Sequence, residues 1–455
     1  MISKRKPLLF AFVLVLFVFA LIGQVQAQNY LNLTLDRAVS VAMENNRDLS
    51  KAKEDIVKSS LQITEAASAA YPTLSAFWDF EKVLKPMVFI IEFPDPTTGL
   101  IKKNRLTAGT DHSMGLGASL NQNLYIGGKV GTALKAAKIY RNISEKTYQT
   151  VEQNIIAGVV QAFNGALLTK EIFRINQESL AQAERNLKNV QTMFDAGSAT
   201  EFDLLRARVQ AANIKPGLLS AENQVVSAKL TLKETLGVPP DAPLTLTGTF
   251  AEPDTSIFKL ASLETALENR PDLMASEYSV DLYEKNIKIA RGDLLPTITA
   301  GSMFQYMGNF DNFKYNANDW IPYWTARVNL SIPIFSGFKN TSRYKQAKID
   351  FHKAKTDYNK TYDSVYIEVQ EGIMNLRNAV KTIESQRMNI EQAERALKMA
   401  ESLYTNGKAT QLEVLDAQLA LEHSKTNMVN ALYTGIVAEI NLKKYLGILD
   451  ADLKI

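Results

Sequence analysis

The chain of 455 residues contains no cysteine and only three histidines. The absence of cysteine excludes disulfides, thiolate nucleophiles, thiolate metal ligands and a lipid-anchored N-terminal cysteine. The histidines, His112, His352 and His423, lie far apart in the sequence, so a histidine-rich metal site has little to build on. We therefore expect no metal site and no cofactor.

The net charge of the chain is only +3. Lysine and arginine number 51 against 48 aspartates and glutamates, and the whole excess of three lies in Lys4, Arg5 and Lys6. Without those three residues the balance is 48 against 48. A chain without net charge has no electrostatic basis for binding nucleic acid, so we expect no nucleic-acid partner.

The N-terminus carries the pattern of a secretory signal. The positive residues 4–6 precede an apolar stretch over 8–22, and Val25-Gln26-Ala27 offers a cleavage site. We therefore interpret residues 1–27 as a signal peptide. The alternative is an uncleaved membrane anchor, for which the apolar stretch is short. We expect no membrane-spanning helix in the rest of the chain.

The sequence repeats itself. QAERNLK at 182–188 recurs as QAERALK at 392–398, and LKETLGV at 232–238 recurs as LKKYLGI at 442–448, both at an offset of 210. Further upstream, Pro-Thr-Leu at 72–74 matches Pro-Thr-Ile at 296–298 at an offset of 224, so the first copy contains 14 additional residues between Pro72 and Gly127. The chain is an internal duplication.

Each copy is expected to contain a helix, two strands and a long helical run that breaks at a glycine and resumes. The first repeat spans 28–240, with helices 36–71, 127–195 and 200–236 and strands about 73–84 and 113–125. A linker over 241–260 leads to the second repeat, 261–448, with helices 261–295, 337–405 and 410–446 and strands about 297–307 and 323–335. A tail follows at 449–455.

The long helices carry coiled-coil spacing. Apolar or small residues recur at alternating steps of three and four, at Leu180, Ala183, Leu187, Val190 and Phe194, and again from Ile390 to Tyr404. A helix from 129 to 195 would be roughly 100 Å long, which suits a span between two membranes. Gly197 and Gly407 are candidates for left-handed helix ends, and Thr200 and Thr410 for the caps of the returning helices.

The strands alternate apolar and polar residues, as in a membrane barrel, although an amphipathic soluble sheet would also alternate. Four strands cannot close a barrel, and open edges are not tolerated in lipid. Closure therefore requires several chains, and three is the smallest number whose twelve strands leave a lumen. The connections near 84–112 and 308–323 are expected to face the cell exterior, where barrel loops are longer.

These features resemble the TolC-like outer membrane efflux factor family. The resemblance rests on the duplicated helix and hairpin layout, the Gly-x-Ala-Thr turns, Asn-x-x-Asp-Leu at Asn45 and Arg-Pro-Asp-Leu at Arg270. It implies an α+β membrane protein of the outer membrane: a homotrimer whose twelve-stranded β-barrel, four strands per chain, continues as a coiled-coil helical barrel in the periplasm. The implied partners are outer-membrane lipid, a periplasmic membrane-fusion adaptor and an inner-membrane transporter of the RND or ABC type.

The resemblance also implies a role: a passive export duct of a tripartite efflux or type I secretion system. It places a periplasmic constriction at Asp203, Tyr404, Glu413 and Asp416, and adaptor-facing turns at Gly197, Thr200, Gly407 and Thr410. The alternative for the acidic residues is an ordinary solvated helix face. Where some relatives have a basic residue two positions after the second turn's glycine, this chain has Ala409, which makes a salt-bridged lock there doubtful.

Two other classes of function remain: a structural coiled-coil protein of the envelope without a pore, and an enzyme. A structural coiled-coil envelope protein without a pore would not need the alternating strands with their nearby tryptophans. An enzyme would need a site, and the motifs that approach one are incomplete: Gly115-Leu116-Gly117 lacks the third glycine of a dinucleotide-binding loop. No constellation of histidine, serine and carboxylate stands out, so we expect no catalytic residues and no enzyme.

Overall fold

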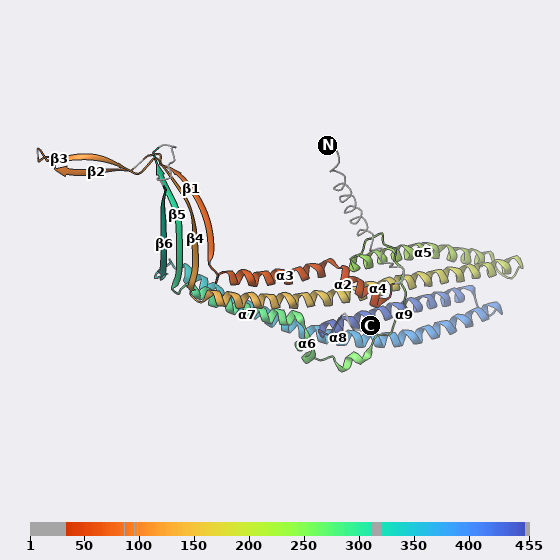
Figure 1. Ribbon diagram of the computed structural model, residues 1–455. Helices are drawn as coiled ribbons and strands as arrows, with labels where there is room; N and C mark the ends of the chain where they lie inside the picture. The colour runs from red at the N-terminus through yellow and green to blue at the C-terminus, as the bar shows by residue number, and fades with distance from the viewer. Residues whose placement is uncertain (1–32, 86, 95, 98, 312–319, 451–455) are drawn as a thin grey trace, which may run out of the picture. The chain divides into compact units, whose positions relative to one another are not determined.

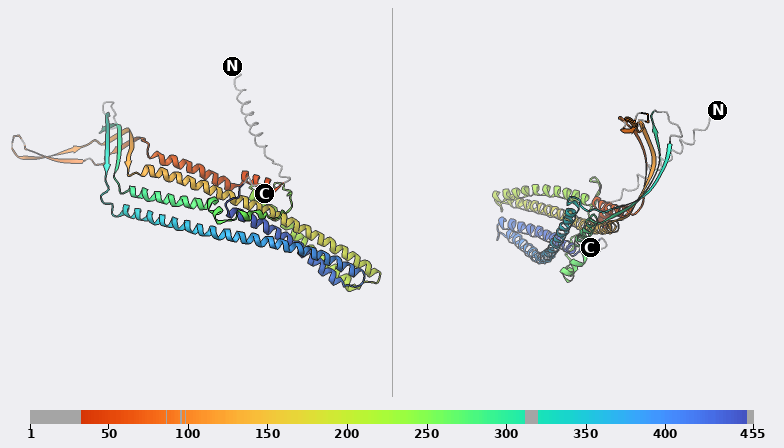
Figure 2. Two further views of the ribbon diagram at one scale, coloured as in Figure 1. Left: turned by 90° about the horizontal axis from the view of Figure 1, so that it is seen from below. Right: turned by 90° about the vertical axis from the view of Figure 1, so that its left-hand side faces the viewer.

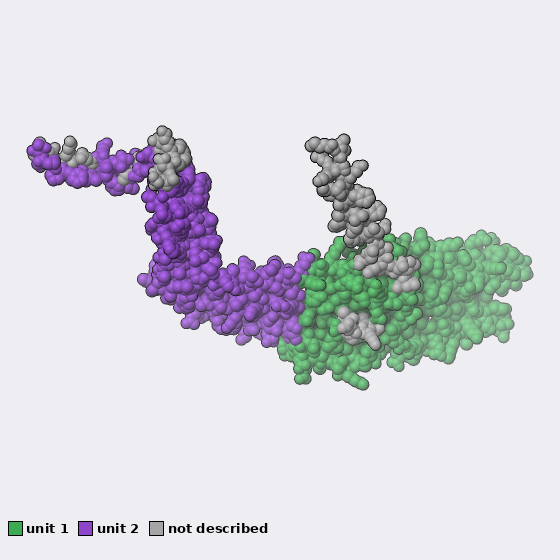
Figure 3. Space-filling view, in the orientation of Figure 1, with its two compact units in different colours: residues 1–53, 147–272, 362–455 green, residues 54–146, 273–361 purple. Residues whose placement is uncertain are grey.

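The computed structural model describes residues 33–85, 87–94, 96–97, 99–311 and 320–450 (Figure 1). The expected signal peptide, 1–27, and residues 451–455 of the expected tail lie outside these ranges. The chain divides into two compact units (Figure 3). Unit 1 comprises residues 1–53, 147–272 and 362–455, and unit 2 comprises residues 54–146 and 273–361.

Two helical hairpins dominate the fold. Helix α4 (Lys129–Asp195) returns as α5 (Glu201–Leu236), and α8 (Lys339–Thr405) returns as α9 (Gln411–Tyr445). Helices α4 and α8 have 67 residues each, and both of their ends differ by the offset of 210. They begin two residues later than expected, because residues 127–128 and 337–338 have positive φ and cannot belong to a right-handed helix.

The shorter helices correct the sequence interpretation. The expected helix 36–71 is two helices, α2 (Leu35–Asn45) and α3 (Arg47–Ser68), and the expected helix 261–295 is α6 (Leu263–Asn269) and α7 (Pro271–Gly292). The backbone is extended at Asn46 and Arg270, the two residues that separate them. Pro271 disfavours a helical Arg270. The Asn46 side chain accepts hydrogen bonds from the backbone N–H groups of Asp48 (2.9 Å) and Leu49 (3.3 Å) and so starts a new helix.

The main core of unit 1 forms where α2, α4 and the end of α5 meet. Ile156, Val159 and Val160 of α4 pack with Val41 of α2 and with Leu236 of α5, all almost fully buried. Helix α4 contains a stretch that is long and apolar enough to cross a membrane by length and composition, and half of it is buried. This corrects the expectation that no such stretch follows the signal peptide. Because the apolar residues of 155–167 supply this core, burial accounts for their composition.

The expected linker, 241–260, joins this unit at two places. Leu246 forms a parallel β-bridge with Leu33, and the short 3₁₀ helix η1 (Thr255–Lys259) is capped by Asp254. The Asp254 backbone N–H donates to the Glu439 carboxylate of α9 at 2.9 Å. The linker therefore contacts both repeats.

Unit 2 contains a four-stranded antiparallel sheet in the order β1-β4-β5-β6 (Figures 1 and 2). Its strands are β1 (Thr73–Lys82), β4 (His112–Ile126), β5 (Thr297–Phe310) and β6 (Trp320–Ser331). Strands β4 and β5 come from different copies of the duplication and pair along most of their length. The sheet is thus built by both copies together.

The register confirms the predicted alternation. Trp78 pairs with Leu116, Leu116 with Tyr306, and Tyr306 with Pro322, so these residues form one row across one face. This face is apolar and exposed; its large side chains include Leu74, Trp78, Phe80, Leu116, Leu120, Phe304, Tyr306, Trp324, Val328 and Leu330.

The opposite face is mostly polar, with Met307, Ile321 and Tyr323 as apolar exceptions, and it uses glycine to make room. A Cβ at Gly115 would lie 2.5 Å from Asp79 Oδ1, and one at Gly117 would lie 2.8 Å from Phe77 Cζ. Each glycine therefore leaves space for the larger residue beside it on the neighbouring strand. Asn121, Arg327 and other polar side chains occupy the same face.

Two strand predictions are corrected. The strand expected at 323–335 begins three residues earlier, at Trp320. It ends at Ser331, because Pro333 cannot donate a ladder hydrogen bond. The connection near 84–112 contains a second, two-stranded sheet, β2 (Met87–Pro94) paired with β3 (Ile101–Ala108). Residues 312–319 of the other connection lie outside the described residues.

Both hairpins end at a glycine that lies against the break between the short helices. Gly237 and Gly447 adopt positive φ (+73° and +72°). A Cβ at Gly237 would lie 2.5 Å from the Asn45 carbonyl oxygen, and one at Gly447 would lie 2.6 Å from the Asn269 carbonyl carbon. Only glycine fits at either contact.

We expect Gly447→Ala to lower the thermal unfolding temperature of the detergent-solubilised protein more than Gly407→Ala does. Each variant strains a left-handed backbone by about 1 kcal/mol. Gly447→Ala must also displace the backbone at residues 269–270, whereas nothing lies within 4 Å of a Cβ at Gly407. Equal unfolding temperatures would show that the contact at Gly447 contributes little.

Candidate functional site

The turn between α4 and α5, residues 195–201, is called the first tip. Gly197 has φ +76°, and its N–H donates to the Phe194 carbonyl at 2.9 Å, while the Ser198 N–H donates to the Met193 carbonyl at 2.8 Å. These bonds satisfy carbonyl groups at the end of α4. Thr200 caps α5, and a Cβ at Gly197 would meet nothing within 4 Å. Local hydrogen bonds therefore hold the first tip in shape, and the space around Gly197 is free.

The turn between α8 and α9, residues 405–411, is called the second tip and has the same construction. Gly407 has φ +67°, and its N–H donates to the Tyr404 carbonyl at 2.9 Å. Thr410 caps α9. The expected left-handed glycines and threonine caps are present at both tips.

Asp203 and Glu413 occupy equivalent positions, and both complete a capping box. The Thr200 N–H donates to Asp203 Oδ2 at 3.2 Å, and the Thr410 N–H donates to Glu413 Oε2 at 2.6 Å. Each carboxylate also lies near the positive end of its helix dipole. The Thr-x-x-Asp and Thr-x-x-Glu patterns were readable in the sequence as capping boxes, so a local structural role for both acids could have been predicted.

Asp416 is exposed and lies one turn beyond Glu413 on α9. Its counterpart in the first repeat is Arg206, whose guanidinium lies 4.7 Å from the centre of the Phe202 ring. Two neighbouring carboxylates of α9, Glu413 and Asp416, therefore correspond to one carboxylate and one cation of α5, Asp203 and Arg206. The two tips differ in charge although their backbones match.

Tyr404, on α8, senses a charge from the other hairpin. Burial raises the pKa of its phenol above the ordinary value, and the negative charge of Asp203 raises it further. Asp203 belongs to α5 and Tyr404 to α8, so these two expected site residues lie close together. Glu413 and Asp416 lie beside each other on α9, and the four residues occupy the same end of the two hairpins.

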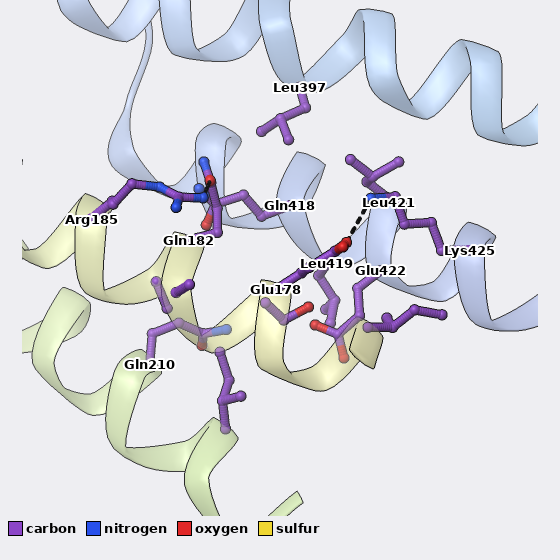
Figure 4. Close-up of a pocket in the computed structure, with 15 residues that line it drawn as sticks. Glu178, Gln182, Arg185, Gln210, Leu397, Gln418, Leu419, Leu421, Glu422 and Lys425 are labelled. Atoms are coloured by element: carbon purple, nitrogen blue, oxygen red, sulfur yellow. Dashed lines mark hydrogen bonds and ion pairs between the residues drawn. The ribbon is translucent and has the colours of Figure 1, made fainter. Parts of the chain in front are cut away.

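The boundary between hairpin α4–α5 and hairpin α8–α9 is called the seam. Polar contacts cross it: Gln182 Nε2 donates to Glu401 Oε1 at 2.8 Å, and Lys425 Nζ lies 3.3 Å from Glu178 Oε2. Apolar side chains, among them Ile175, Leu397 and Leu419, line it as well. A cavity of about 270 Å³ lies within it (Figure 4). Gln418 and Glu422 of α9 line the cavity with residues from the other three helices. The seam thus contains both polar contacts and empty space.

A buried ion cluster holds the break between α6 and α7. The Arg270 guanidinium donates to Asp272 through Nε (2.9 Å) and Nη2 (2.6 Å), and through Nη1 to Glu368 of α8. Burial lowers the pKa of Arg270, but the hydrogen bonds to Asp272 and Glu368 outweigh burial and raise it. The cluster ties α8 to the short helices.

The first repeat lacks this cluster. The offsets of 224 and 210 place Asn46 at the position of Arg270 and Gly158 at the position of Glu368. There the Asn46 amide donates to the Thr235 carbonyl at 3.0 Å. The Arg-Pro-Asp-Leu motif was recognised from the sequence, but its partner Glu368, 98 residues away, was not.

Among the described residues, no group of three or more histidines, aspartates and glutamates is arranged to hold a metal ion.

We expect Asp203→Asn to lower the pKa of Tyr404, because it removes the negative charge that disfavours the tyrosinate. The pKa should stay above the ordinary value, since Tyr404 remains partly buried. Difference titration of tyrosine absorbance between each protein and its Tyr404→Phe derivative isolates this group. Asp416→Asn removes a carboxylate of α9 that does not contribute to the raised pKa of Tyr404. The titration midpoint of Tyr404 should therefore stay unchanged in that variant. An unchanged midpoint in Asp203→Asn would contradict the coupling.

Comparison with known proteins identifies the fold and the family. The chain is 25% identical over 335 residues to the outer membrane protein TolC of Vibrio cholerae, covering 73% of this chain and 76% of TolC. It is 24% identical over 424 residues to the pyoverdine export outer membrane protein OpmQ of Pseudomonas putida, covering 91% and 85%. The crystal structure of the Campylobacter jejuni CmeC outer membrane channel superposes with a TM-score of 0.78 at 17% identity, covering 92% of this chain and 87% of that one.

The family described as outer membrane efflux protein matches residues 38–238 and 262–448. These segments lie within the two expected repeats and include every expected site residue. The resemblance predicted from the sequence is confirmed, and the chain belongs to the outer membrane efflux protein family.

Proposed function

We propose that this protein is the outer-membrane channel of a tripartite efflux or type I secretion system, a passive duct formed by three chains. The observation that carries the proposal is the four-stranded sheet: it has one exposed apolar face, one polar face and two unpaired edges, and it continues into two long helical hairpins. Membership of the outer membrane efflux protein family supports the same role.

The sheet supports a barrel shared between chains. The outer edges of β1 and β6 have no strand beside them in the sheet. Hydrocarbon offers no hydrogen bonds to such edges, so β1 of one chain must pair with β6 of the next. Three chains give a barrel of twelve strands, with the apolar face toward lipid and the polar face around a water-filled lumen.

The tips support a junction with other proteins. In a trimer, three first tips and three second tips would gather around one axis, each with a glycine turn that is sterically open. We propose that Gly197, Thr200, Gly407 and Thr410 face a periplasmic membrane-fusion adaptor, which connects the duct to an inner-membrane transporter of the RND or ABC type. OpmQ is named for pyoverdine export, which agrees with a role in export rather than in catalysis.

The same end supplies the constriction. Threefold repetition would turn Asp203, Tyr404, Glu413 and Asp416 into rings around the axis. Glu413 and Asp416 are both exposed and three residues apart on α9, so both can contribute to one level of negative charge. The capping-box bonds hold Glu413 in place without neutralising it.

The competing function is a structural coiled-coil protein of the envelope that has no pore. Both readings explain the long hairpins, but only the duct explains a sheet with an exposed apolar face. Recordings in planar lipid bilayers separate them directly. If the protein is a duct, the purified protein should produce discrete steps of ion conductance. A structural protein without a pore should produce none.

The first prediction of this proposal concerns charge at the constriction. Rings of carboxylates in a narrow passage focus the field and hold multivalent cations, so trivalent cations added from the tip side should block the channel. Glu413→Gln combined with Asp416→Asn should relieve the block. Removal of two exposed carboxylates far from the tips, Glu264→Gln with Glu268→Gln on α6, is the matched control and should leave it intact. Equal block in both double variants would place Glu413 and Asp416 outside the lumen.

The second prediction concerns topology. Leu100 and Asp311 are exposed residues in the two connections on the side of the sheet away from the helices. In this cysteine-free chain, Leu100→Cys and Asp311→Cys should react with an impermeant maleimide on intact cells. Lys381→Cys, an exposed position on α8, should react only after the outer membrane is opened. Reaction of Lys381→Cys but not of the other two on intact cells would reverse the proposed orientation.

A further inference from the structure

The Gln411 side chain is a buried amide. It is only 2% exposed, and among the described residues neither Oε1 nor Nε2 has a hydrogen-bond partner. The burial arises within a single chain, so association with other chains can only increase it. Both polar atoms of the amide are therefore closed off from bulk solvent and from a neighbouring subunit while the chain keeps this arrangement.

The position of Gln411 relates it to the seam. Gln411, Gln418 and Lys425 are spaced by seven residues and lie on the same side of α9. Gln418 and Lys425 line the cavity in the seam, and Lys425 pairs with Glu178 of α4 (Figure 4). Gln411 is thus the tip-end residue of the α9 stripe that faces the first hairpin, and the buried Val414 follows one turn later.

The duplication provides an internal comparison. The offset of 210 places Glu201 at the corresponding position of α5, and Glu201 is exposed. A charged side chain is acceptable there because water solvates it. In the second repeat the position is buried, yet it still carries a polar side chain rather than an apolar one.

We propose that Gln411 is a positioning residue for opening of the duct: its unsatisfied amide disfavours the packed arrangement of the two tips and so keeps the seam ready to part. This inference rests on the proposed function. An amide that loses water without gaining a partner is costly, and parting of the tips would return it to water. The effect on the ratio of packed to parted tips is on the order of tenfold.

The rest of the seam agrees with this role. Its polar contacts include the hydrogen bond from Gln182 to Glu401 and the ion pair of Lys425 with Glu178. Its cavity reduces the packing that would otherwise hold the hairpins together. Polar contacts exchange readily for water when the surfaces separate.

The test uses Gln411→Met, which keeps the length of the side chain and removes its polar atoms. Val414→Cys, introduced into every protein compared, reports opening because Val414 is 2% exposed and the chain has no other cysteine. In the purified protein, thiol labelling at this position should be about tenfold slower with Gln411→Met than with Gln411. Gln411→Glu, which buries a charge instead, should label faster.

The matched control is Glu201→Met, which makes the same kind of replacement at the exposed position and should leave the labelling rate unchanged. Thermal unfolding reports whether each variant is folded, and Gln411→Met should unfold at the same temperature as the unmodified protein or higher. Equal or faster labelling, or a lower unfolding temperature, in Gln411→Met would overturn the proposal, because the amide would then stabilise the packed tips. Labelling requires no ion conduction, so its result is independent of whether the protein proves to be a channel.

Discussion

The proposed assembly depends on one constraint: the two edge strands of the four-stranded sheet have backbone groups without hydrogen-bond partners in the sheet. Within one chain, β4 and β5 are paired on both sides, while β1 and β6 are each paired on only one. In water an open edge is a risk of aggregation, but in lipid it is an energetic cost that no side chain can offset. In the proposed channel a neighbouring chain completes the sheet, and three chains repeat the tips and their charges threefold.

The two repeats share the backbone conformation of their turns and helix ends, but they carry different side chains at several equivalent positions. The turns, caps and C-terminal glycines match between the repeats, because the same left-handed backbone is required in each. Two of the differences lie at the break between the short helices and at the tips. Arg270 with Glu368 replaces Asn46 with Gly158, and Gln411 replaces Glu201. In each case the second repeat buries a polar group where the first keeps a small or solvated one.

Much of the fold was predictable because the signals were local. Gly197 and Gly407, each followed by a threonine, marked the ends of the long helices, and two-residue alternation placed Trp78 and Leu116 on the apolar face. The break at Arg270 was missed although Pro271 signalled it, since helical periodicity continues on both sides. Strands β2 and β3 were missed because the inserted segment has no counterpart in the second copy to define its pattern.

The site was less predictable, since it depends on contacts between distant segments. The pairing of Asp203 with Tyr404 and the burial of Gln411 arise from the packing of one hairpin against the other, which no local pattern encodes. The capping role of Asp203 and Glu413 is the opposite case, because each four-residue capping-box pattern could be recognised in the sequence. Both residues therefore stabilise a helix start, in addition to the role that the resemblance implies.

The central claim is that three chains close one barrel. Native mass spectrometry of the purified protein, released from detergent in the gas phase, counts the chains directly. The account predicts a single dominant species containing three chains, which persists when the solution is diluted. A monomer or a dimer as the dominant folded species would contradict it, because four or eight strands would leave no lumen for export.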